Sequence, residues 1–296
     1  MNADLRMSTA WPDYELIDFG EGRKLERFGA WVLDRPCPAA VGARKARPQA
    51  WRGVTGKFVG ERAAAGEWTP HPDRWSAPPQ LHVPLESCGS FSMTGFPLPS
   101  GQIGVFPEQF DNWQWLARQT VQKSEPLKAL NLFGYTGGST LALAAAGASV
   151  VHIDAAKSAV ALTGVNANAS GLGDRPIRRI AEDAIKFCRR EIRRANRYHA
   201  IVLDPPTYGH GPKGEEWIIK RDLLPLLELC GELTERRPKL VLLTCHSPGI
   251  GPAELSAYLS EGIFGACGQP PRTGELFLET AQRRRLPSGV FARWPG

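Results

Sequence analysis

The chain has no apolar run approaching the roughly 20 residues needed to cross a bilayer. Its opening residues, Met1-Asn-Ala-Asp-Leu-Arg6, contain no apolar h-region of a secretory signal, so we expect a cytoplasmic protein without a membrane anchor. Its cysteines are few and scattered, at positions 37, 88, 188, 230, 245 and 267. Because no Cys-x-x-Cys pair or His-rich partner accompanies them, we expect reduced thiols and no metal site.

Two common phosphate-binding motifs are also missing. The apolar run 130–133 predicts a short buried strand, and the Ala/Leu-rich segment 139–146 predicts a helix that Gly147 closes. The glycine turn between them lacks the Gly-x-Gly-x-x-Gly spacing of dinucleotide folds and the Lys-Ser/Thr of a phosphate loop. A strand, a glycine turn and a helix start still let backbone N–H groups approach a ligand closely. The turn therefore predicts a ligand site of another kind.

Length and composition indicate a globular protein with an appendage. A chain of 296 residues can hold one large α/β domain and a smaller module. Hydrophobic residues make up 42% and charged residues 22%, which is ordinary for a soluble protein. The net charge of +6 suits a polyanionic partner, but many enzymes are equally basic. Charge alone does not identify the partner.

Residues 1–105 predict a small β-rich N-terminal domain that could contact substrate or RNA. Alternating segments at 14–19 and 24–28 flank Gly20-Glu-Gly22 and predict a hairpin, with further short strands at 30–33, 57–59 and 81–83. Basic residues are interleaved with aromatic ones here: Arg44, Lys45, Arg47, Trp51, Arg52, Lys57 and Phe58. These could contact nucleic acid. For the tryptophans we favour a role in a small core, whereas the charges are equally well explained as solvated.

Residues 106–296 predict a second domain, beginning with a helix near 108–117. Expected strands alternate with expected helices: strands at 129–133, 149–153, 176–180, 199–203 and 239–244, helices at 139–146, 155–169, 182–196, 218–235 and 255–264. Segments 275–279 and 289–293 predict a final hairpin. This rhythm predicts an α/β fold, a doubly wound, Rossmann-like sheet of seven strands that binds ligands at the carboxyl ends of its parallel strands.

Polar residues follow the expected strands where such a ligand would lie. Asp154 lies 20 residues after Gly134; we favour a ribose contact there over capping of the next helix. For Asp183 an adenine contact and a capping role are equally supported. Asp204-Pro-Pro206 forms a stiff, acidic loop suited to an amine-bearing planar substrate. The Cys245 thiol would face the same opening, either as a nucleophile or as an inert core residue.

Several motifs in order resemble one family. They are Asn131-Leu-Phe-Gly-Tyr-Thr-Gly-Gly138, His152-Ile-Asp-Ala155, Asn166–Leu172, Asp204-Pro-Pro206 and Thr244-Cys-His-Ser247. Together they resemble class I S-adenosylmethionine (SAM)-dependent methyltransferases, and specifically the bacterial 23S ribosomal-RNA cytosine-C5 group. The resemblance implies SAM as cofactor, with a pocket formed by Phe133, Gly134, Tyr135, Thr136, Gly137, Asp154, Ala155, Asp183 and Asp204. It also implies that Pro205, Pro206 and Tyr208 bind the substrate, and that Asp204 and Cys245 are catalytic.

The resemblance implies a covalent route, with RNA as the substrate. The Cys245 thiolate would add to C6 of cytosine, helped by Asp204 at the N3/N4 edge, so that C5 can attack the methyl group; His246 or a water would then remove the C5 proton. Residues 1–105 do not resemble the PUA RNA-binding domain of that group. Asp204-Pro-Pro-Thr-Tyr208 also resembles relatives that methylate guanine N7 without a cysteine. Methylation of a small molecule or protein, and an inactive SAM- or RNA-binding module, remain alternatives.

Arginines offer a separate hint of RNA. They lie along the helix expected at 182–196, as Arg189, Arg190, Arg193 and Arg194, and in Arg283-Arg-Arg285. Such groups can bind phosphates, although cations at a helix carboxyl end also complement its dipole and need have no other role.

Overall fold

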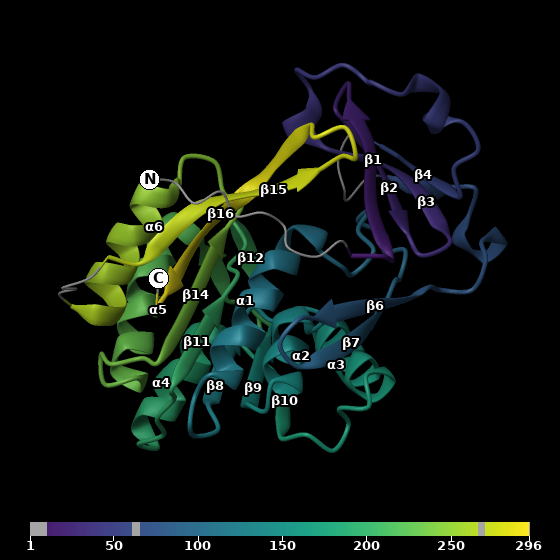
Figure 1. Ribbon diagram of the computed structural model, residues 1–296. Coiled ribbons are helices and arrows are strands. Elements are labelled where there is room, and N and C mark those ends of the chain that lie inside the picture. The colour runs from purple at the N-terminus through teal and green to yellow at the C-terminus, as the bar shows by residue number, and fades with distance from the viewer. Residues whose placement is uncertain (1–10, 61–65, 266–269, 296) are drawn as a thin grey trace.

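The computed structural model describes residues 11–60, 66–265 and 270–295. Its centre is a seven-stranded sheet (Figure 1). The strands are, in sheet order, β10 (Ile177–Ala181), β9 (Ser149–Asp154), β8 (Lys128–Leu132), β11 (Ala200–Leu203), β14 (Leu240–Cys245), β16 (Arg285–Trp294) and β15 (Arg272–Glu279). The first five are parallel, and β16 runs antiparallel to both neighbours. The predicted doubly wound sheet and its final hairpin are confirmed.

Helices cover both faces of this sheet (Figure 1). One face carries α1 (Phe110–Val121), α2 (Gly138–Ala145) and α3 (Lys157–Ala169); the other carries α4 (Ala184–Arg193), α5 (Ile219–Leu233) and α6 (Pro252–Tyr258). Helix α6 continues as a π-helical turn, Leu259–Phe264. Successive residues of β14 alternate between the two cores: Leu240 and Leu242 join the first, Val241 and Leu243 the second. The buried strands are therefore apolar on both sides, as parallel strands require.

The N-terminal residues form a separate five-stranded sheet. It consists of β1 (Tyr14–Gly20), β2 (Arg23–Phe28), β3 (Trp31–Pro36), β4 (Gly56–Val59) and β5 (Glu67–Thr69) in that order. Glu21 and Gly22 turn the first hairpin with φ angles of 55° and 74°. Trp31 and Trp68 are buried, and both meet Trp75 edge to face, with ring centroids 5.0 and 5.1 Å away. The expected β-rich module is present, and these tryptophans fill its core.

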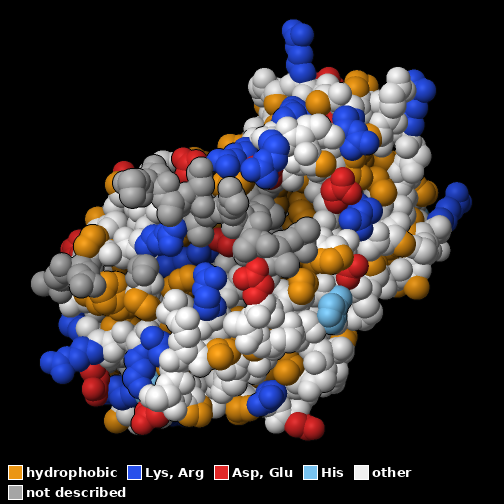
Figure 2. Space-filling view, viewed as in Figure 1, with side chains coloured by type: hydrophobic (Ala, Val, Ile, Leu, Met, Phe, Trp, Pro, Cys, Tyr) orange, Lys and Arg blue, Asp and Glu red, His pale blue; other side chains and the backbone are white. Residues whose placement is uncertain are grey.

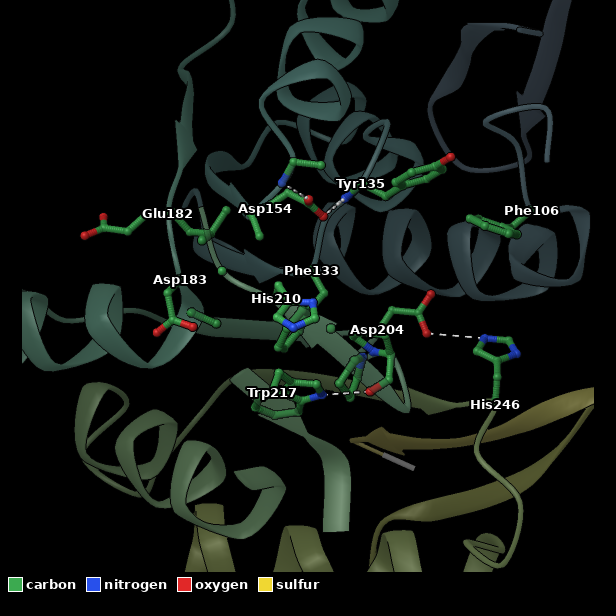
Figure 3. A pocket seen from close by; sticks show the side chains of 18 of the residues that line it. Phe106, Phe133, Tyr135, Asp154, Glu182, Asp183, Asp204, His210, Trp217 and His246 are labelled. Atoms are coloured by element: carbon green, nitrogen blue, oxygen red, sulfur yellow. Dashed lines mark hydrogen bonds and ion pairs between the residues drawn. The ribbon is translucent and has the colours of Figure 1, made fainter. Parts of the chain in front are cut away.

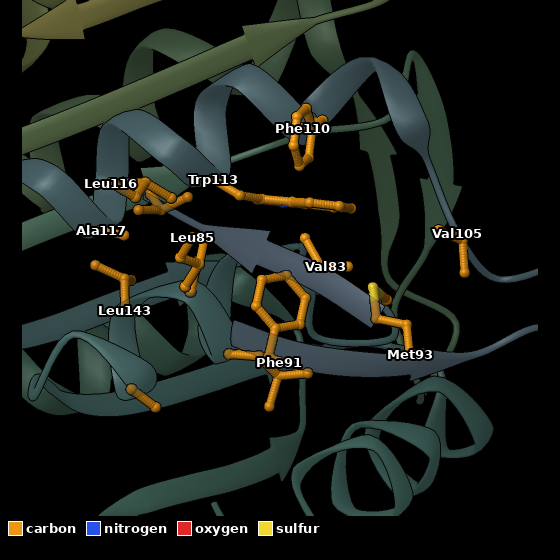
Figure 4. Close-up of a cluster of buried hydrophobic side chains, with 14 of the residues drawn as sticks. Val83, Leu85, Phe91, Met93, Val105, Phe110, Trp113, Leu116, Ala117 and Leu143 are labelled. Carbon is orange, nitrogen blue, oxygen red and sulfur yellow. The ribbon is translucent and has the colours of Figure 1, made fainter. Parts of the chain in front are cut away.

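A hairpin from the N-terminal region packs on the helices of the second domain. It is made of β6 (Gln80–Leu85) and β7 (Gly89–Thr94), and Figure 4 shows its apolar side chains between α1 and α2. The Thr94 N–H donates to Asn166 Oδ1 at 2.9 Å, on α3. The hydrophobic cluster runs without a break from Trp31 through Phe91 to the helices. The predicted division near residue 105 therefore crosses a shared core rather than an open linker.

A buried carboxylate ties the two sheets together. Asp18, 1% exposed, accepts from Trp51 Nε1 at 2.9 Å and from Arg284 Nη1 at 2.6 Å. Burial would raise the pKa of Asp18, but hydrogen bonds from Trp51 and backbone N–H groups lower it. Arg284 also lies over the Phe19 ring, 4.2 Å from its centroid. Arg284, which the sequence offered as a phosphate ligand, is thus a structural residue, and Arg285 similarly pairs with Glu279.

Candidate active site

A cavity of about 610 Å³ opens at the carboxyl ends of β8, β9, β10 and β11, where the fold predicts a ligand (Figure 3). Its lining consists of Gln102, Phe106, Glu108, Phe133, Tyr135, Ile153, Asp154, Ala155, Ala156, Glu182, Asp183, Ala184, Asp204, Pro205, Pro206, Gly209, His210, Gly211, Trp217 and His246. Asp154 and Asp183 lie toward one end, and Asp204 with His246 toward the other (Figure 3). The lining is mostly apolar with a few convergent carboxylates, which is typical of a small-molecule site.

The structure brings together most of the residues predicted for the site. Those in the lining are Phe133, Tyr135, Asp154, Ala155, Asp183, Asp204, Pro205 and Pro206. Those outside it are Gly134, Thr136, Gly137, Tyr208 and Cys245. The two groups differ for local physical reasons.

The turn after β8 directs two aromatic side chains into the cavity. Phe133 and Tyr135 have φ angles of 56° and 48°, a left-handed conformation that is uncommon for residues other than glycine. Phe133 packs against Trp217 with ring centroids 4.8 Å apart, and Tyr135 against Phe106 at 5.3 Å. Backbone strain of this kind is typically found at ligand sites, where the surrounding structure maintains it.

The glycines of that turn face protein rather than the cavity. A Cβ on Gly134 would lie 2.5 Å from the His152 ring, and one on Gly137 would lie 2.6 Å from Thr163 Cγ2. The Thr136 hydroxyl donates to the Gly104 carbonyl. The expectation that these three residues line the pocket is therefore not met; the glycines are needed because the turn presses against β9 and α3.

A buried polar network supports the turn from below. His152 is fully buried, with Nδ1 2.9 Å from Thr140 Oγ1 and Nε2 3.2 Å from Thr163 Oγ1. Burial lowers the pKa of His152 to about 4, so the ring is neutral. Thr163 in turn donates to the Tyr135 carbonyl at 3.0 Å. His152 therefore supports the turn and does not line the cavity.

Asp154 joins the loops that follow β8 and β9. Its Oδ2 accepts from the Tyr135 N–H and its Oδ1 from the Ala156 N–H, both at 2.8 Å. Helix α3 begins only at Lys157, and Asp154 does not cap it. Burial raises the pKa of Asp154. The carboxylate is thus fixed in the cavity lining, where a ligand's hydroxyl groups could reach it.

Asp183 caps the amino end of α4, which is one of the two roles predicted for it. Its Oδ1 accepts from the Lys186 N–H at 2.8 Å at the start of α4. The same side chain lies in the cavity lining beside Glu182. Capping and ligand contact are therefore compatible at this position.

Asp204 has two hydrogen-bond donors and one ion-pair partner. Thr244 Oγ1 donates to Oδ1 at 2.6 Å, Gln109 Nε2 to Oδ2 at 3.1 Å, and His246 Nε2 lies 3.3 Å from Oδ1. Burial would raise the pKa of Asp204, but the charge and hydrogen bond of His246, with those from Thr244 and Gln109, lower it. Reciprocally, burial opposes but Asp204 raises the pKa of His246 to about 9. Each member of the pair therefore stabilises the charged form of the other.

Cys245 does not face the opening as expected. Its side chain is 1% exposed and joins the core on the side of α5 and α6, with Leu243. Its Sγ accepts from the Ser247 N–H at 3.4 Å. Residues alternate along a strand, so Thr244 faces Asp204 and Cys245 faces the opposite side. Cys267, another scattered cysteine, lies outside the described residues.

Tyr208 lies on a short hairpin beside the cavity. The hairpin pairs β12 (Tyr208–His210) with β13 (Glu216–Ile218) and supplies His210 and Trp217 to the lining. Tyr208 itself is 53% exposed, and its hydroxyl lies 3.0 Å from His210 Nε2. Trp217 Nε1 donates to the Pro206 carbonyl at 2.7 Å, which fastens the hairpin to the acidic loop.

Other lining residues were missed by sequence reasoning. Gln102, Phe106 and Glu108 come from the segment that leads into α1, and nothing in their spacing marks them. His246 was predicted only as a candidate base for the C5 proton, not as a partner of Asp204; the alternation of β14, which places it on the same side as Thr244, could have indicated this position. Within the described ranges, no group of three or more His, Cys, Asp or Glu side chains could hold a metal ion, and each helix is too short or too polar to span a bilayer.

The strand order with one antiparallel strand, and a cavity at the carboxyl ends of the parallel strands, define a Rossmann-like α/β protein that binds a small ligand at that edge. The chain is 35% identical to a SAM-dependent methyltransferase of Agrobacterium tumefaciens of solved structure, with a TM-score of 0.84 over 95% of this chain and 90% of that one. The chain belongs to the SAM-dependent methyltransferases.

More distant similarities agree with this membership. A Streptococcus mutans structure described as a SAM-dependent methyltransferase has a TM-score of 0.71 over 97% of this chain and 76% of that one; at 17% identity it shows the fold alone. Ribosomal RNA large subunit methyltransferase K/L of Methylococcus capsulatus is 34% identical over 117 residues, 39% of this chain. Methyltransferase I of Aeromonas salmonicida is 32% identical over 108 residues, 36% of this chain. The matches span only 16% and 26% of those two proteins. No protein-family model matches the chain.

Proposed function

We propose that this protein transfers the methyl group of SAM to a base in RNA, in keeping with a cytoplasmic location. The observation that carries the proposal is the cavity itself, which has a fixed carboxylate, Asp154, toward one end and an ionised carboxylate, Asp204, toward the other. The names of the curated relatives, ribosomal RNA large subunit methyltransferases, support RNA as the substrate class.

The residues of the cavity fit a nucleoside. Asp154 presents carboxylate oxygens suited to ribose hydroxyls, and Asp183 lies beside it for the adenine amine. Aromatic rings of Phe133, Tyr135 and Phe106 supply apolar walls. SAM, when bound, supplies an electrophilic methyl group on a sulfonium. The cavity volume of about 610 Å³ lies within the range of small-ligand sites.

Asp204 and its prolines would hold the acceptor base. A base nitrogen that attacks the methyl carbon becomes positively charged as the carbon–sulfur bond breaks, and the proton it then loses goes to water. The Asp204 carboxylate accepts a hydrogen bond from that nitrogen and stabilises the developing charge. Pro205 and Pro206 keep the loop rigid, and the Trp217 contact to the Pro206 carbonyl fixes it further. Electrostatic stabilisation of this kind commonly lowers a barrier by several kcal/mol.

The target atom distinguishes two versions of the proposal. Methylation of a nitrogen needs no thiol, which agrees with the burial of Cys245 outside the cavity. Methylation of cytosine C5 needs the Cys245 thiolate within bonding distance of C6, and therefore a rearrangement of β14 when RNA binds. The position of Cys245 favours a nitrogen.

Charge supports RNA binding less directly. Figure 2 shows Lys and Arg side chains scattered over the visible face and interleaved with acidic ones. Several arginines proposed from the sequence are paired, such as Arg190 with Glu182 and Arg283 with Glu279. We propose that Arg189 and Arg193, exposed on α4, supply phosphate contacts. Their replacement by Ala should weaken RNA binding and flatten its salt dependence.

The direct test is transfer of tritium from methyl-labelled SAM to cell fractions. Wild-type protein should label RNA, and Asp204→Ala should not, while SAM still raises the melting temperature of both proteins. Label in the protein or small-molecule fraction instead would refute RNA as substrate. SAM binding without transfer to any fraction would indicate an inactive binding module, and stabilisation by NAD rather than SAM would contradict the cofactor.

A further inference from the structure

The surroundings of His246 determine where its protons lie. His246 follows β14 at the cavity mouth, where 38% of its side chain is exposed. Its Nδ1 is 2.6 Å from the Ser288 carbonyl oxygen, and its Nε2 is 3.3 Å from Asp204 Oδ1. A carbonyl oxygen only accepts hydrogen bonds, and a carboxylate oxygen beside a ring nitrogen is stabilised by a hydrogen on that nitrogen, so this placement favours a hydrogen on each ring nitrogen. The geometry is that of an imidazolium.

The fold has features that maintain this arrangement. Gly289, with φ of +126°, lets β16 approach so closely that a Cβ there would lie 2.7 Å from His246 Nδ1. The Thr207 and Ser247 hydroxyls are 2.7 Å apart and join the loop after Asp204 to the loop after His246. The Thr207–Ser247 hydrogen bond therefore joins the loops that carry the two charged side chains, and the close approach of Gly289 fixes the His246 ring against β16.

The groups around Asp204 and His246 favour the charged form of each. Thr244 and Gln109 both donate to Asp204. Glu108 also acts on His246, and its charge favours the protonated ring. Among the described residues, neither His246 nor Asp204 forms an ion pair with any other side chain. The polar partners of Asp204 are therefore Thr244, Gln109 and His246, and its remaining lone pairs can accept a hydrogen bond from a substrate.

We infer that His246 is a positioning residue that stays doubly protonated and keeps Asp204 as an ionised, acceptor-only group facing the substrate. The inference rests on the proposed function for its catalytic consequence. An ionised Asp204 carboxylate can accept but not donate a hydrogen bond. It therefore favours a substrate base that presents an N–H group over one that presents a carbonyl oxygen or an unprotonated ring nitrogen. A ring with no free lone pair also cannot serve as the base that removes a proton from C5, a role considered for His246 from sequence.

Spectroscopy tests the protonation state without any RNA. In ¹⁵N-histidine-labelled protein, long-range ¹H–¹⁵N spectra distinguish an imidazolium from both neutral tautomers. The His246 signal, assigned by its loss in His246→Gln, should be that of an imidazolium at pH 7.5. His210, which also lines the cavity but meets a hydroxyl that can donate or accept, is the internal reference. A neutral His246 ring at pH 7.5 would overturn the inference.

A second measurement follows Asp204. The ¹³C signal of its carboxyl, assigned with Asp204→Asn, should titrate at higher pH in His246→Gln than in the wild type, because the variant lacks the positive partner. Removing one charged hydrogen bond should also lower methyl transfer by about tenfold at pH 6, with less loss at pH 8 and little change in SAM affinity. His246→Lys, which restores a cation, should recover part of the acid-side activity.

The outcomes separate this inference from the proposed function. An unchanged Asp204 titration in His246→Gln would contradict the inference even if RNA is methylated. Absence of RNA labelling by the wild type would contradict the proposed substrate, while the two spectra would still decide the state of the pair.

Discussion

Gly137→Ala should destabilise the protein more than Gly147→Ala, although both glycines have similar positive φ angles. Their φ angles are +99° and +96°, so alanine at either position is strained by about 1–2 kcal/mol. A Cβ at Gly147 meets nothing within 4 Å, whereas one at Gly137 lies 2.6 Å from Thr163 Cγ2. Overpacking of this kind adds about 1–3 kcal/mol. Gly147→Ala therefore measures the conformational cost, and the difference between the variants measures the crowding.

Urea unfolding of the two variants and of Gly137→Ala combined with Thr163→Ser provides the test. Serine removes the nearest methyl group and keeps the hydroxyl that bonds the Tyr135 carbonyl, so the double variant should recover part of the loss. SAM affinity should fall in Gly137→Ala because the displaced turn carries Tyr135. Equal losses of unfolding free energy in the two single variants, or no recovery in the double variant, would refute the packing role of Gly137.

Three further predictions concern the cavity and its support. Asp154→Asn leaves one acceptor oxygen for two backbone N–H groups. The Kd for SAM, measured by calorimetry, should therefore rise by about tenfold. The control Glu182→Gln should change this Kd by less than about twofold. Cys245→Ser should leave tritium transfer to RNA near the wild-type rate; complete loss would favour the covalent C5 route. Arg284→Ala leaves a buried carboxylate without its ion partner and should lower the free energy of unfolding by about 3 kcal/mol. Arg283→Ala is the matched control, because the Arg283 side chain is 80% exposed. It should lower the free energy of unfolding by less than about 0.5 kcal/mol in the same urea series.

Much of the fold could be predicted because the parallel strands are short apolar runs with clear ends. The run at 129–133 became β8 (Lys128–Leu132), and the other strands agree within one or two residues at most ends. The helix expected at 182–196 is shorter, Ala184–Arg193, because Asp183 caps it and Ala195 leaves helical geometry with φ of 54°. The Asp183 cap is a signal that the sequence carries, whereas nothing in the sequence marks Ala195 for a left-handed conformation.

The site was predictable only where it follows the ends of strands. Asp154, Asp183 and Asp204 occupy such positions and do lie in the cavity lining. The orientation of Cys245 depends on which face of β14 meets α5, a tertiary property that a single buried strand does not reveal. The contribution of Phe106 depends on long-range packing against the turn after β8, and no local pattern encodes it.

The segment leading into α1 gives the cavity a wall that a Rossmann-like core alone would lack. Gln102, Phe106 and Glu108 line the cavity, and Gln102 also accepts from Arg35 of the N-terminal sheet at 3.0 Å. An expression fragment starting at α1 would keep every strand of the large sheet yet lack these three residues, and the end of the cavity near Asp204 and His246 would open to bulk water. A chimera that replaces the N-terminal sheet would therefore have to keep residues 102–109 together with the domain that contains the seven-stranded sheet.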